Sequence, residues 1–167
     1  FQKKIKKREF LLQAGNVCRE VSFTVKGCVK VFYIDDNGTE VIMRFFDENW
    51  WVVDMFSLVH KKPSNYNIDA IEDSEFLVLS YDSAVRLYEK IPKIEEVFRA
   101  TYLKNSEILA KRLTSLISEP AEKRYSDFIE EYPSIYKRIP QKLLANYLGV
   151  TPSFLSRMKK NIPGNDR

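Results

Sequence analysis

Two periodicities divide the chain into a strand-rich part and a helical part. Over residues 9–80, short segments alternate apolar and polar positions, as at 21–25 and 41–45, and residues 28–34 are dense in Val, Phe and Tyr. Alternation of this kind is typical of half-buried β-strands. From residue 92 to 118, apolar residues recur instead at helical spacing. The pattern predicts an N-terminal β-domain followed by helices.

Turn residues separate the expected strands. Gly27 stands between two of them, and Asp-Asn-Gly at 36–38 favours a type I′ hairpin turn, because Asn and Gly tolerate positive φ. Segments 67–71 and 75–80 predict a further strand pair joined by a short connection. Many short strands at this spacing predict an antiparallel β-roll or jelly-roll sandwich.

The helical part predicts a dimer interface. Ser80 can cap a short helix over Tyr81–Lys90, and Pro92–Ser118 predicts one long helix that ends before Pro120. The apolar positions of the long helix cover more than half of its circumference, which is too wide a stripe for one partner. We therefore expect one side to pack on the β-domain and another on the same helix of a second subunit. The alternative is a helix buried within one chain. The expected interface residues are Val97, Phe98, Ile108, Leu109 and Leu116.

Residues 141–160, QKLLANYLGVTPSFLSRMKK, carry the most specific pattern of the chain. Two short helices joined at Gly149 account for it, because Gly can adopt the positive φ of a tight turn. Ala145 is small where the helices would cross, and Thr151 is an N-cap followed by Pro152 at the first helical position. The apolar positions that would fill the crossing are Leu144, Leu148, Val150, Leu155 and Met158. This combination is typical of a helix-turn-helix.

Positive charge gathers in the same region. The net charge is +4, yet residues 137–167 hold seven basic residues and one acidic residue, a balance of +6, whereas residues 1–136 carry −2. A face of one sign suits a polyanion such as DNA. We expect Arg157 to contact bases and the lysines to contact phosphates, whereas the basic run at 3–8 is expected to be a solvated face. The expected DNA-binding residues are Lys142, Thr151, Ser153, Ser156, Arg157, Lys159 and Lys160.

Composition argues against other classes of function. With 167 residues, of which 44% are hydrophobic, the chain suits one domain with a small appendage. One histidine, His60, and two cysteines, Cys18 and Cys28, are too few for a zinc or iron–sulfur centre or for most histidine-based catalysis. No apolar run approaches the length of a membrane span. We expect a cytoplasmic protein that is not an enzyme, with structural thiols, no metal, no cofactor and no membrane contact.

Several stretches carry a family resemblance that covers nearly the whole chain. They are EFLLQAG at 9–15, VKGCV at 25–29, AIEDS at 70–74 and the segment 141–160. With the order of β-roll, long helix and helix-turn-helix, they resemble the Crp/Fnr family of bacterial transcription regulators. The phrases KKPSNYNIDAIEDSE and RIPQKLLANYLGVTPSFLSR look like its Bacteroidetes branch.

The resemblance implies an α+β fold in three parts. These are an antiparallel β-roll over residues 1–91, a dimerisation helix over 92–118 and a helix-turn-helix DNA-binding domain over 119–167. It also implies a homodimer on an inverted-repeat site in double-stranded DNA. A small-molecule effector and RNA polymerase are the further partners that it implies.

The expected ligand pocket departs from the family pattern. Cyclic-nucleotide-binding members have a Gly-Glu pair whose Glu takes the ribose hydroxyl, and an Arg further along that takes the cyclic phosphate. Here Val53-Asp54 and Ser64-Asn65 stand at those places. The phosphate lacks its cation, so cyclic AMP and cyclic GMP are not expected to bind. The expected pocket residues are Trp50, Trp51, Asp54, Ser64, Asn65 and Tyr66, although the aromatic ones also suit an ordinary core.

The DNA-binding part departs from the family pattern as well. Pro152, Ser153 and Arg157 stand where Crp-like members commonly have Arg, Glu and Arg, so the DNA sequence cannot be carried over. The winged hairpin of such members is expected to be shortened to residues 132–139. One alternative is a sensor whose helix-turn-helix docks on a protein, which would not need a +6 tail. A jelly-roll cupin enzyme is the other, and a single histidine argues against its metal site.

Overall fold

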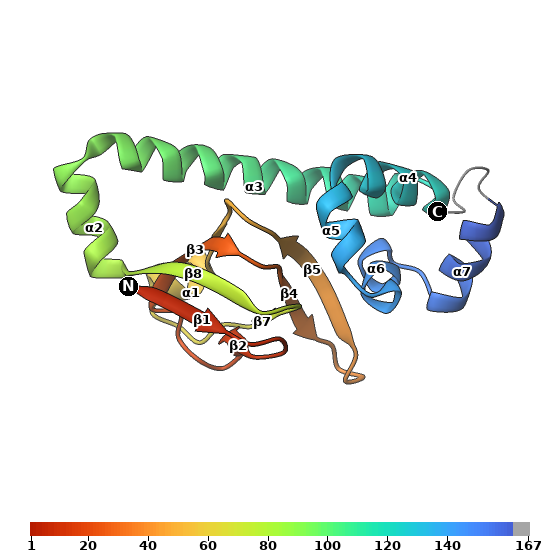
Figure 1. The fold of residues 1–167 in the computed structure, drawn as a ribbon, viewed down its shortest axis with the longest axis horizontal. Helices are drawn as coiled ribbons and strands as arrows, with labels where there is room; N and C mark the ends of the chain where they lie inside the picture. Colours follow the sequence, from red (N-terminus) through yellow and green to blue (C-terminus); the bar gives the residue numbers. More distant parts are fainter. Residues whose placement is uncertain (162–167) are drawn as a thin grey trace.

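The structure, a computed structural model, describes residues 1–161. An N-terminal β-roll of two four-stranded antiparallel sheets is joined by one long helix to a C-terminal group of helices (Figure 1). One sheet has the order β1 (Gln2–Ile5), β8 (Ser74–Ser80), β3 (Glu20–Lys26) and β6 (Trp51–Val52). The other has the order β2 (Phe10–Leu12), β7 (Asn67–Ala70), β4 (Val29–Ile34) and β5 (Glu40–Phe46). The predicted α+β class is confirmed.

The two sheets bury an apolar core between them. Val29, Ile68, Phe76 and Val78 are at most 2% exposed and belong to one cluster. The basic run at 3–8 contributes the edge strand β1, whose exposed side carries ion pairs such as Lys4–Glu75. The chain therefore closes the roll with its own N-terminal segment.

The turn between β4 and β5 differs from the predicted one. The N–H of Asp35 donates to the Thr39 carbonyl over 3.0 Å, which closes a five-residue loop. Only Gly38 in this loop has a positive φ, at 77°. The Asp35 carboxylate accepts hydrogen bonds from the backbone N–H groups of Asn37 and Thr39. The type I′ prediction is wrong, because this carboxylate closes the turn while Asn37 keeps a negative φ.

Segments 67–71 and 75–80 form strands as predicted, but they do not pair with each other. β7 pairs with β2 and β4, whereas β8 pairs with β1 and β3 in the other sheet. Gly27 makes the neighbouring crossing between the sheets at φ 105°, and a Cβ there would lie 2.1 Å from Ser74 Oγ. The prediction of a strand pair is wrong, because the connection from β7 to β8 passes from one sheet to the other, next to the connection from β3 to β4.

The remaining elements are helices. They are α1 (Met55–His60), α2 (Tyr81–Lys90), α3 (Pro92–Ser118), α4 (Ala121–Glu131), α5 (Pro133–Arg138), α6 (Gln141–Leu148) and α7 (Pro152–Asn161). The predicted bounds of α2 and α3 are confirmed, and Ser80 Oγ caps α2 by accepting from Ser83 N. Pro133–Arg138 form α5 within the segment 132–139, so the prediction of a shortened hairpin there is wrong; Pro133 suits the first turn of a helix. No helix within residues 1–161 has both the length and the apolar composition needed to cross a membrane.

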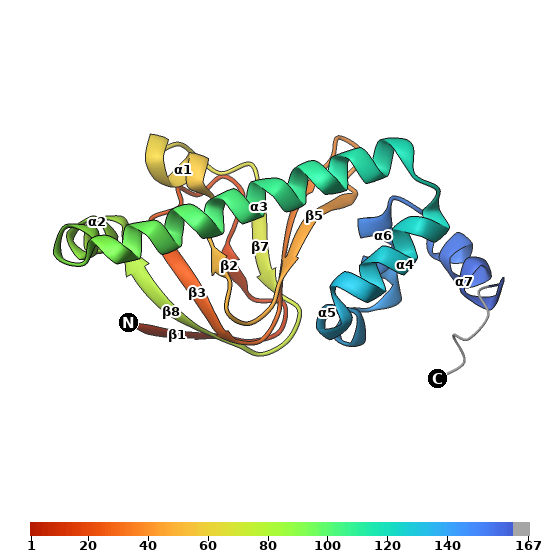
Figure 2. The ribbon, with the colours of Figure 1, turned by 90° about the horizontal axis from the view of Figure 1, so that it is seen from above.

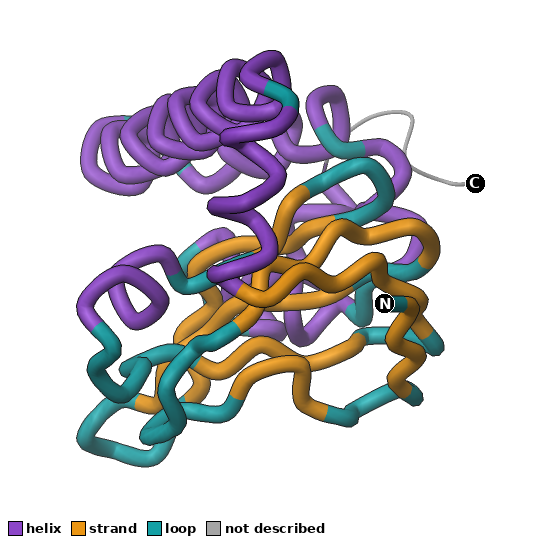
Figure 3. Tube along the Cα trace, turned by 90° about the vertical axis from the view of Figure 1, so that its left-hand side faces the viewer, coloured by secondary structure: helices purple, strands orange, loops and turns teal. Residues whose placement is uncertain are grey.

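α3 lies along the β-roll, and the helices after it lie beyond one side of the roll, with α6 against β5 and α7 farthest from the strands (Figures 2 and 3). One hydrophobic cluster combines strand and helix residues; it includes Cys28, Phe32, Ile42, Phe45, Tyr125, Phe128, Ile139, Leu144 and Leu148. Cys18 and Cys28 are buried free thiols, as expected, and burial raises the pKa of Cys28 to about 12. The β-roll and the C-terminal helices thus share a core.

Candidate functional sites

The helix-turn-helix forms as predicted. Gly149 ends α6 with φ 70°, and its N–H donates to the Asn146 carbonyl over 3.0 Å. Thr151 Oγ1 then accepts from Phe154 N over 3.2 Å and caps α7. The side chains that fill the crossing are at most 4% exposed; they are Leu144, Ala145, Leu148, Leu155 and Met158, with Val150 half-buried beside them.

The outer face of α7 is polar and basic. Ser153, Ser156, Arg157 and Lys160 are exposed on this helix, and Thr151 and Lys142 are exposed beside it. Lys159 is half-buried: its Nζ donates to Gln141 Oε1 over 3.2 Å. α7 lies at the end of the molecule opposite α2 (Figure 2). The structure thus gathers the seven predicted DNA-binding residues on α6, α7 and the turn between them.

Polar contacts hold the helix-turn-helix against the β-roll. The Arg112 guanidinium of α3 donates to the carbonyls of Ile42, Met43 and Tyr147 over 2.8–3.0 Å. Asn146 Oδ1 accepts from Ile42 N over 2.8 Å, which occupies the free edge of β5. Because α3, β5 and α6 meet through these bonds, the orientation of the helix-turn-helix is tied to the β-roll.

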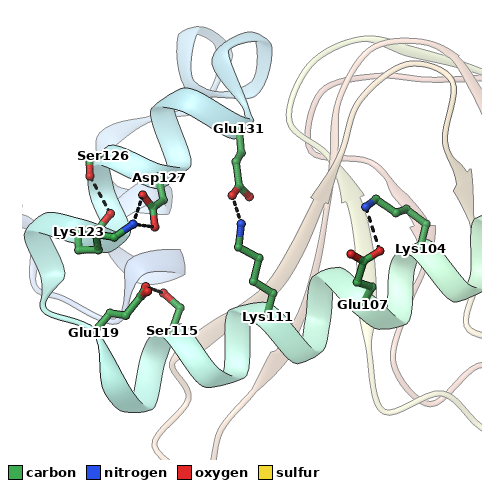
Figure 4. Close-up of polar contacts among 9 residues, drawn as sticks. All are labelled: Lys104, Glu107, Lys111, Ser115, Glu119, Lys123, Ser126, Asp127 and Glu131. Carbon is green, nitrogen blue, oxygen red and sulfur yellow. Dashed lines mark hydrogen bonds and ion pairs between the residues drawn. The ribbon is translucent and has the colours of Figure 1, made fainter.

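Ion pairs add to this attachment. Arg138 of α5 donates to both carboxylate oxygens of Glu48 over 2.7 Å and also binds Glu72. This contact lowers the pKa of Glu48 to about 2 and raises that of Arg138. Lys111 of α3 pairs with Glu131 of α4 (Figure 4).

A cavity of about 350 Å³ lies between the β-roll and α3. Trp51, Asp54 and Tyr66, three of the six predicted pocket residues, line it. Trp50 is half-buried and packs against the core, Ser64 is buried at 3% exposure, and Asn65 is exposed. Much of the remaining lining is apolar and includes Met43, Met55, Phe98 and Leu109.

The residues aligned with a cyclic-nucleotide site bind one another. Asp54 Oδ1 caps α1 by accepting from Ser57 N over 3.1 Å. Its Oδ2 accepts from Ser64 Oγ over 2.6 Å. Both oxygens of the carboxylate that the resemblance places at the ribose are therefore already hydrogen-bonded within the chain.

Sequence analysis missed one buried cation of the cavity, Arg44, which is 5% exposed. Val31 pairs with Arg44 and the next residue of β4, Phe32, pairs with Ile42, so Met43 is an extra residue that makes a β-bulge. The bulge breaks the expected alternation at 41–45 and brings Arg44 to the cavity. The only signal in the sequence was an arginine inside the apolar run 41–46.

The expected dimer-interface residues of α3 divide between two environments. Val97 is 51% exposed, whereas the other four are half-buried. Phe98 stacks on Trp51 with ring centroids 4.2 Å apart, and Leu109 lines the cavity. Ile108 and Leu116 face the C-terminal helices. Within one chain no residue of α3 is fully buried.

Comparisons with known proteins agree with this architecture. The family model of the cyclic nucleotide-binding domain matches residues 2–90. FixK2 from Bradyrhizobium japonicum superimposes with a TM-score of 0.82 at 15% identity, covering 96% of this chain and 82% of that one. The c-di-GMP responsive global regulator CLP from Xanthomonas campestris gives 0.76 at 14% identity, covering 96% and 84%. A transcriptional regulator of the Crp/Fnr family from Thermus thermophilus gives 0.76 at 13% identity, again covering 96% and 84%.

A search of curated proteins finds no match to the chain. The match over residues 2–90 spans more than half of the sequence, and the structural likeness extends through the long helix and the helix-turn-helix. The chain therefore belongs to the cyclic nucleotide-binding domain family, and its fold is that of the Crp/Fnr transcription regulators.

Proposed function

We propose that the protein is a sequence-specific DNA-binding regulator of transcription that acts as a homodimer in the cytoplasm and has no catalytic activity. The observation that carries this proposal is the exposed basic face of α7 on a closely packed helix-turn-helix. Such a helix can enter the major groove while its amino end meets the phosphate backbone. RNA polymerase is the further partner expected of such a regulator.

Arg157 reads bases in this proposal, because a guanidinium can pair bidentately with guanine. Lys142, Lys159 and Lys160 bind phosphates and contribute affinity without sequence preference. Lys159 must first leave Gln141, to which it is hydrogen-bonded, so its contribution is the smallest of the three.

An apolar stripe of α3 supplies the dimer interface. Leu103, Leu113 and Ile117 are 63%, 61% and 78% exposed, and exposed apolar side chains that lie together mark interaction surfaces. With Ser106 and Ala110 between them, they repeat at alternating spacings of three and four residues. This is the spacing at which two helices pack along a seam. Because Leu109 and Leu116 face their own chain, the proposed seam lies on the neighbouring side of α3.

Cyclic AMP and cyclic GMP do not act as effectors in this proposal. A cyclic phosphate beside Asp54 and Ser64 would meet a carboxylate and no cation. Burying an unpaired charge is costly, and the hydrogen bonds of Asp54 would have to break first.

The experiment is selection of bound fragments from random DNA, with Arg157→Ala compared with Arg86→Ala, an exposed arginine of α2. The wild-type protein and Arg86→Ala should enrich one inverted repeat, with half-sites about 34 Å apart, or one helical turn. Arg157→Ala should lose preference at one base pair of each half-site, by roughly 1–3 kcal/mol. Recovery of no common sequence by the wild-type protein would contradict the proposal and favour docking on a protein.

A further inference from the structure

We infer that the cavity between the β-roll and α3 binds a small apolar carboxylate, whose anionic group is held by Arg44. The inference rests on the proposed function, since it names the class of effector that would occupy the regulator's sensor domain. The family pattern would place the anion at Ser64 and Asn65. The inference places it instead beside Arg44 on β5.

Arg44 differs from the other buried cation of the described chain. Lys30 is 6% exposed and lies within 3.4 Å of two carboxylates, those of Glu40 and Asp69. Arg44 is 5% exposed, yet within residues 1–161 it has no carboxylate at ion-pair distance. A buried cation without a counter-ion is costly, and an anion from outside the chain would lower that cost.

Two other arginines, Arg112 of α3 and Arg138 of α5, have more partners than Arg44, although Nε of Arg112 has no hydrogen-bond partner within residues 1–161. Arg112 donates to three backbone carbonyls, and Arg138 pairs with Glu48 and Glu72. Among the described residues, Arg44 makes one hydrogen bond, from Nη1 to Asn105 Oδ1 of α3. A guanidinium has five N–H donors, so donors of Arg44 remain for a ligand in the cavity that it lines.

Arg44 is also held in a fixed orientation. Its guanidinium carbon lies 4.5 Å from the ring centroids of both Phe46 and Trp50. Aromatic faces hold the planar guanidinium, and Asn105 fixes one of its nitrogens. A planar fork fixed in this way matches the two oxygens of a carboxylate.

The rest of the cavity lining indicates that the body of the ligand is apolar. Met43, Trp51, Met55, Phe98 and Leu109 supply apolar lining. Asp54, the carboxylate in the lining, already accepts two hydrogen bonds from its own chain. About 350 Å³ lies at the lower end of the usual range for ligand cavities, which suits a compact molecule. The sugar and base of a nucleotide would lose hydrogen bonds to water on such a surface.

The test is calorimetric titration of the full chain with two carboxylates, 2-naphthoate and octanoate, and with their neutral amides. At least one carboxylate should bind saturably at one site per chain and more tightly than its amide. Arg44→Met should weaken that carboxylate roughly 10- to 100-fold and leave amide binding unchanged, because a charge-assisted bidentate contact is lost. Lys104→Met, at an exposed residue of the same helix as Asn105, is the matched control and should bind like the wild type.

Arg44→Lys keeps the charge without the fork, so it should bind the carboxylate with intermediate affinity. It also covers the case in which Arg44→Met does not fold, which circular dichroism would reveal. Equal affinity for acid and amide, equal binding by Arg44→Lys and the wild type, or no binding of either acid at about 5 mM would overturn the inference. Selection from random DNA with the same wild-type sample tests the proposed function separately. If the wild-type protein binds the carboxylate but selects no DNA sequence, only the proposed function is contradicted.

Discussion

The Glu48–Arg138 ion pair fastens α5 to the β-roll, and its removal should cost stability in a pH-dependent way. The change is Glu48→Gln. Glu48 Oε1 also accepts from the N–H of Gly27 over 2.8 Å, and the amide oxygen of Gln can keep that bond. The substitution therefore removes the charge that faces Arg138 while it preserves shape and the backbone contact.

The magnitude follows from the pKa of Glu48, which the Arg138 hydrogen bonds lower from 4.5 to about 2. At about 1.4 kcal/mol per pKa unit this shift corresponds to roughly 3 kcal/mol of stability at neutral pH. The Glu48 side chain is 33% exposed, so solvent screening reduces the expected loss to ~1–2 kcal/mol.

The sign of the pH dependence is fixed by the lowered pKa of the folded state. The carboxylate stabilises the folded protein fully above its unfolded pKa near 4.5, and this contribution disappears as the pH falls toward 2. Urea unfolding followed by circular dichroism at pH 7, 5, 4 and 3 measures it. Glu48→Gln should be less stable than the wild type at pH 7 and 5, and the difference should shrink at pH 4 and 3.

Glu75→Gln is the control, because Glu75 pairs with Lys4 on the exposed side of the roll. It should change stability less than Glu48→Gln at pH 7, as surface ion pairs usually do. A deficit for Glu48→Gln that stays constant from pH 7 to pH 3 would refute the electrostatic reasoning and point to a packing defect. Unchanged stability of Glu48→Gln at pH 7 would refute the claim that the Glu48–Arg138 ion pair stabilises the packing of α5 on the β-roll.

Three further changes test other parts of the molecule. Leu113→Glu should give a monomer in sedimentation velocity and weaken DNA binding, whereas a dimer that persists would place the interface elsewhere than the proposed seam. Gly149→Ala should lower stability to urea by about 1–2 kcal/mol, because φ is 70° and the new Cβ would lie 3.3 Å from Leu116 Cδ2; a neutral effect would mean that the turn can relax. Lys160→Ala should weaken specific and random DNA alike and reduce the slope of log K against log salt by roughly one unit, and a selective loss at one sequence would contradict its phosphate role.

The helix-turn-helix could be predicted from the sequence because its determinants are local. Gly149 supplies the positive φ of the turn, Thr151 caps the next helix, and the apolar spacing of the two helices matches their crossing. Each of these preferences acts within a few residues, so tertiary packing had little to change. The same holds for α2 and α3, whose ends are set by Ser80 and by the proline at the start of α3.

Tertiary structure decided which segments became partners. Strands β7 and β8 were recognisable, but their assignment to different sheets depends on pairing with strands far away in the sequence. Likewise, the apolar stripe of α3 predicted two contact surfaces, and only packing showed which side faces the β-roll. The cavity depends most on such pairing: Arg44 reaches it because Met43 bulges against β4. A bulge follows from the register between strands and not from the composition of either strand. No local pattern could therefore predict that this arginine is buried with no carboxylate beside it in the described part of the chain.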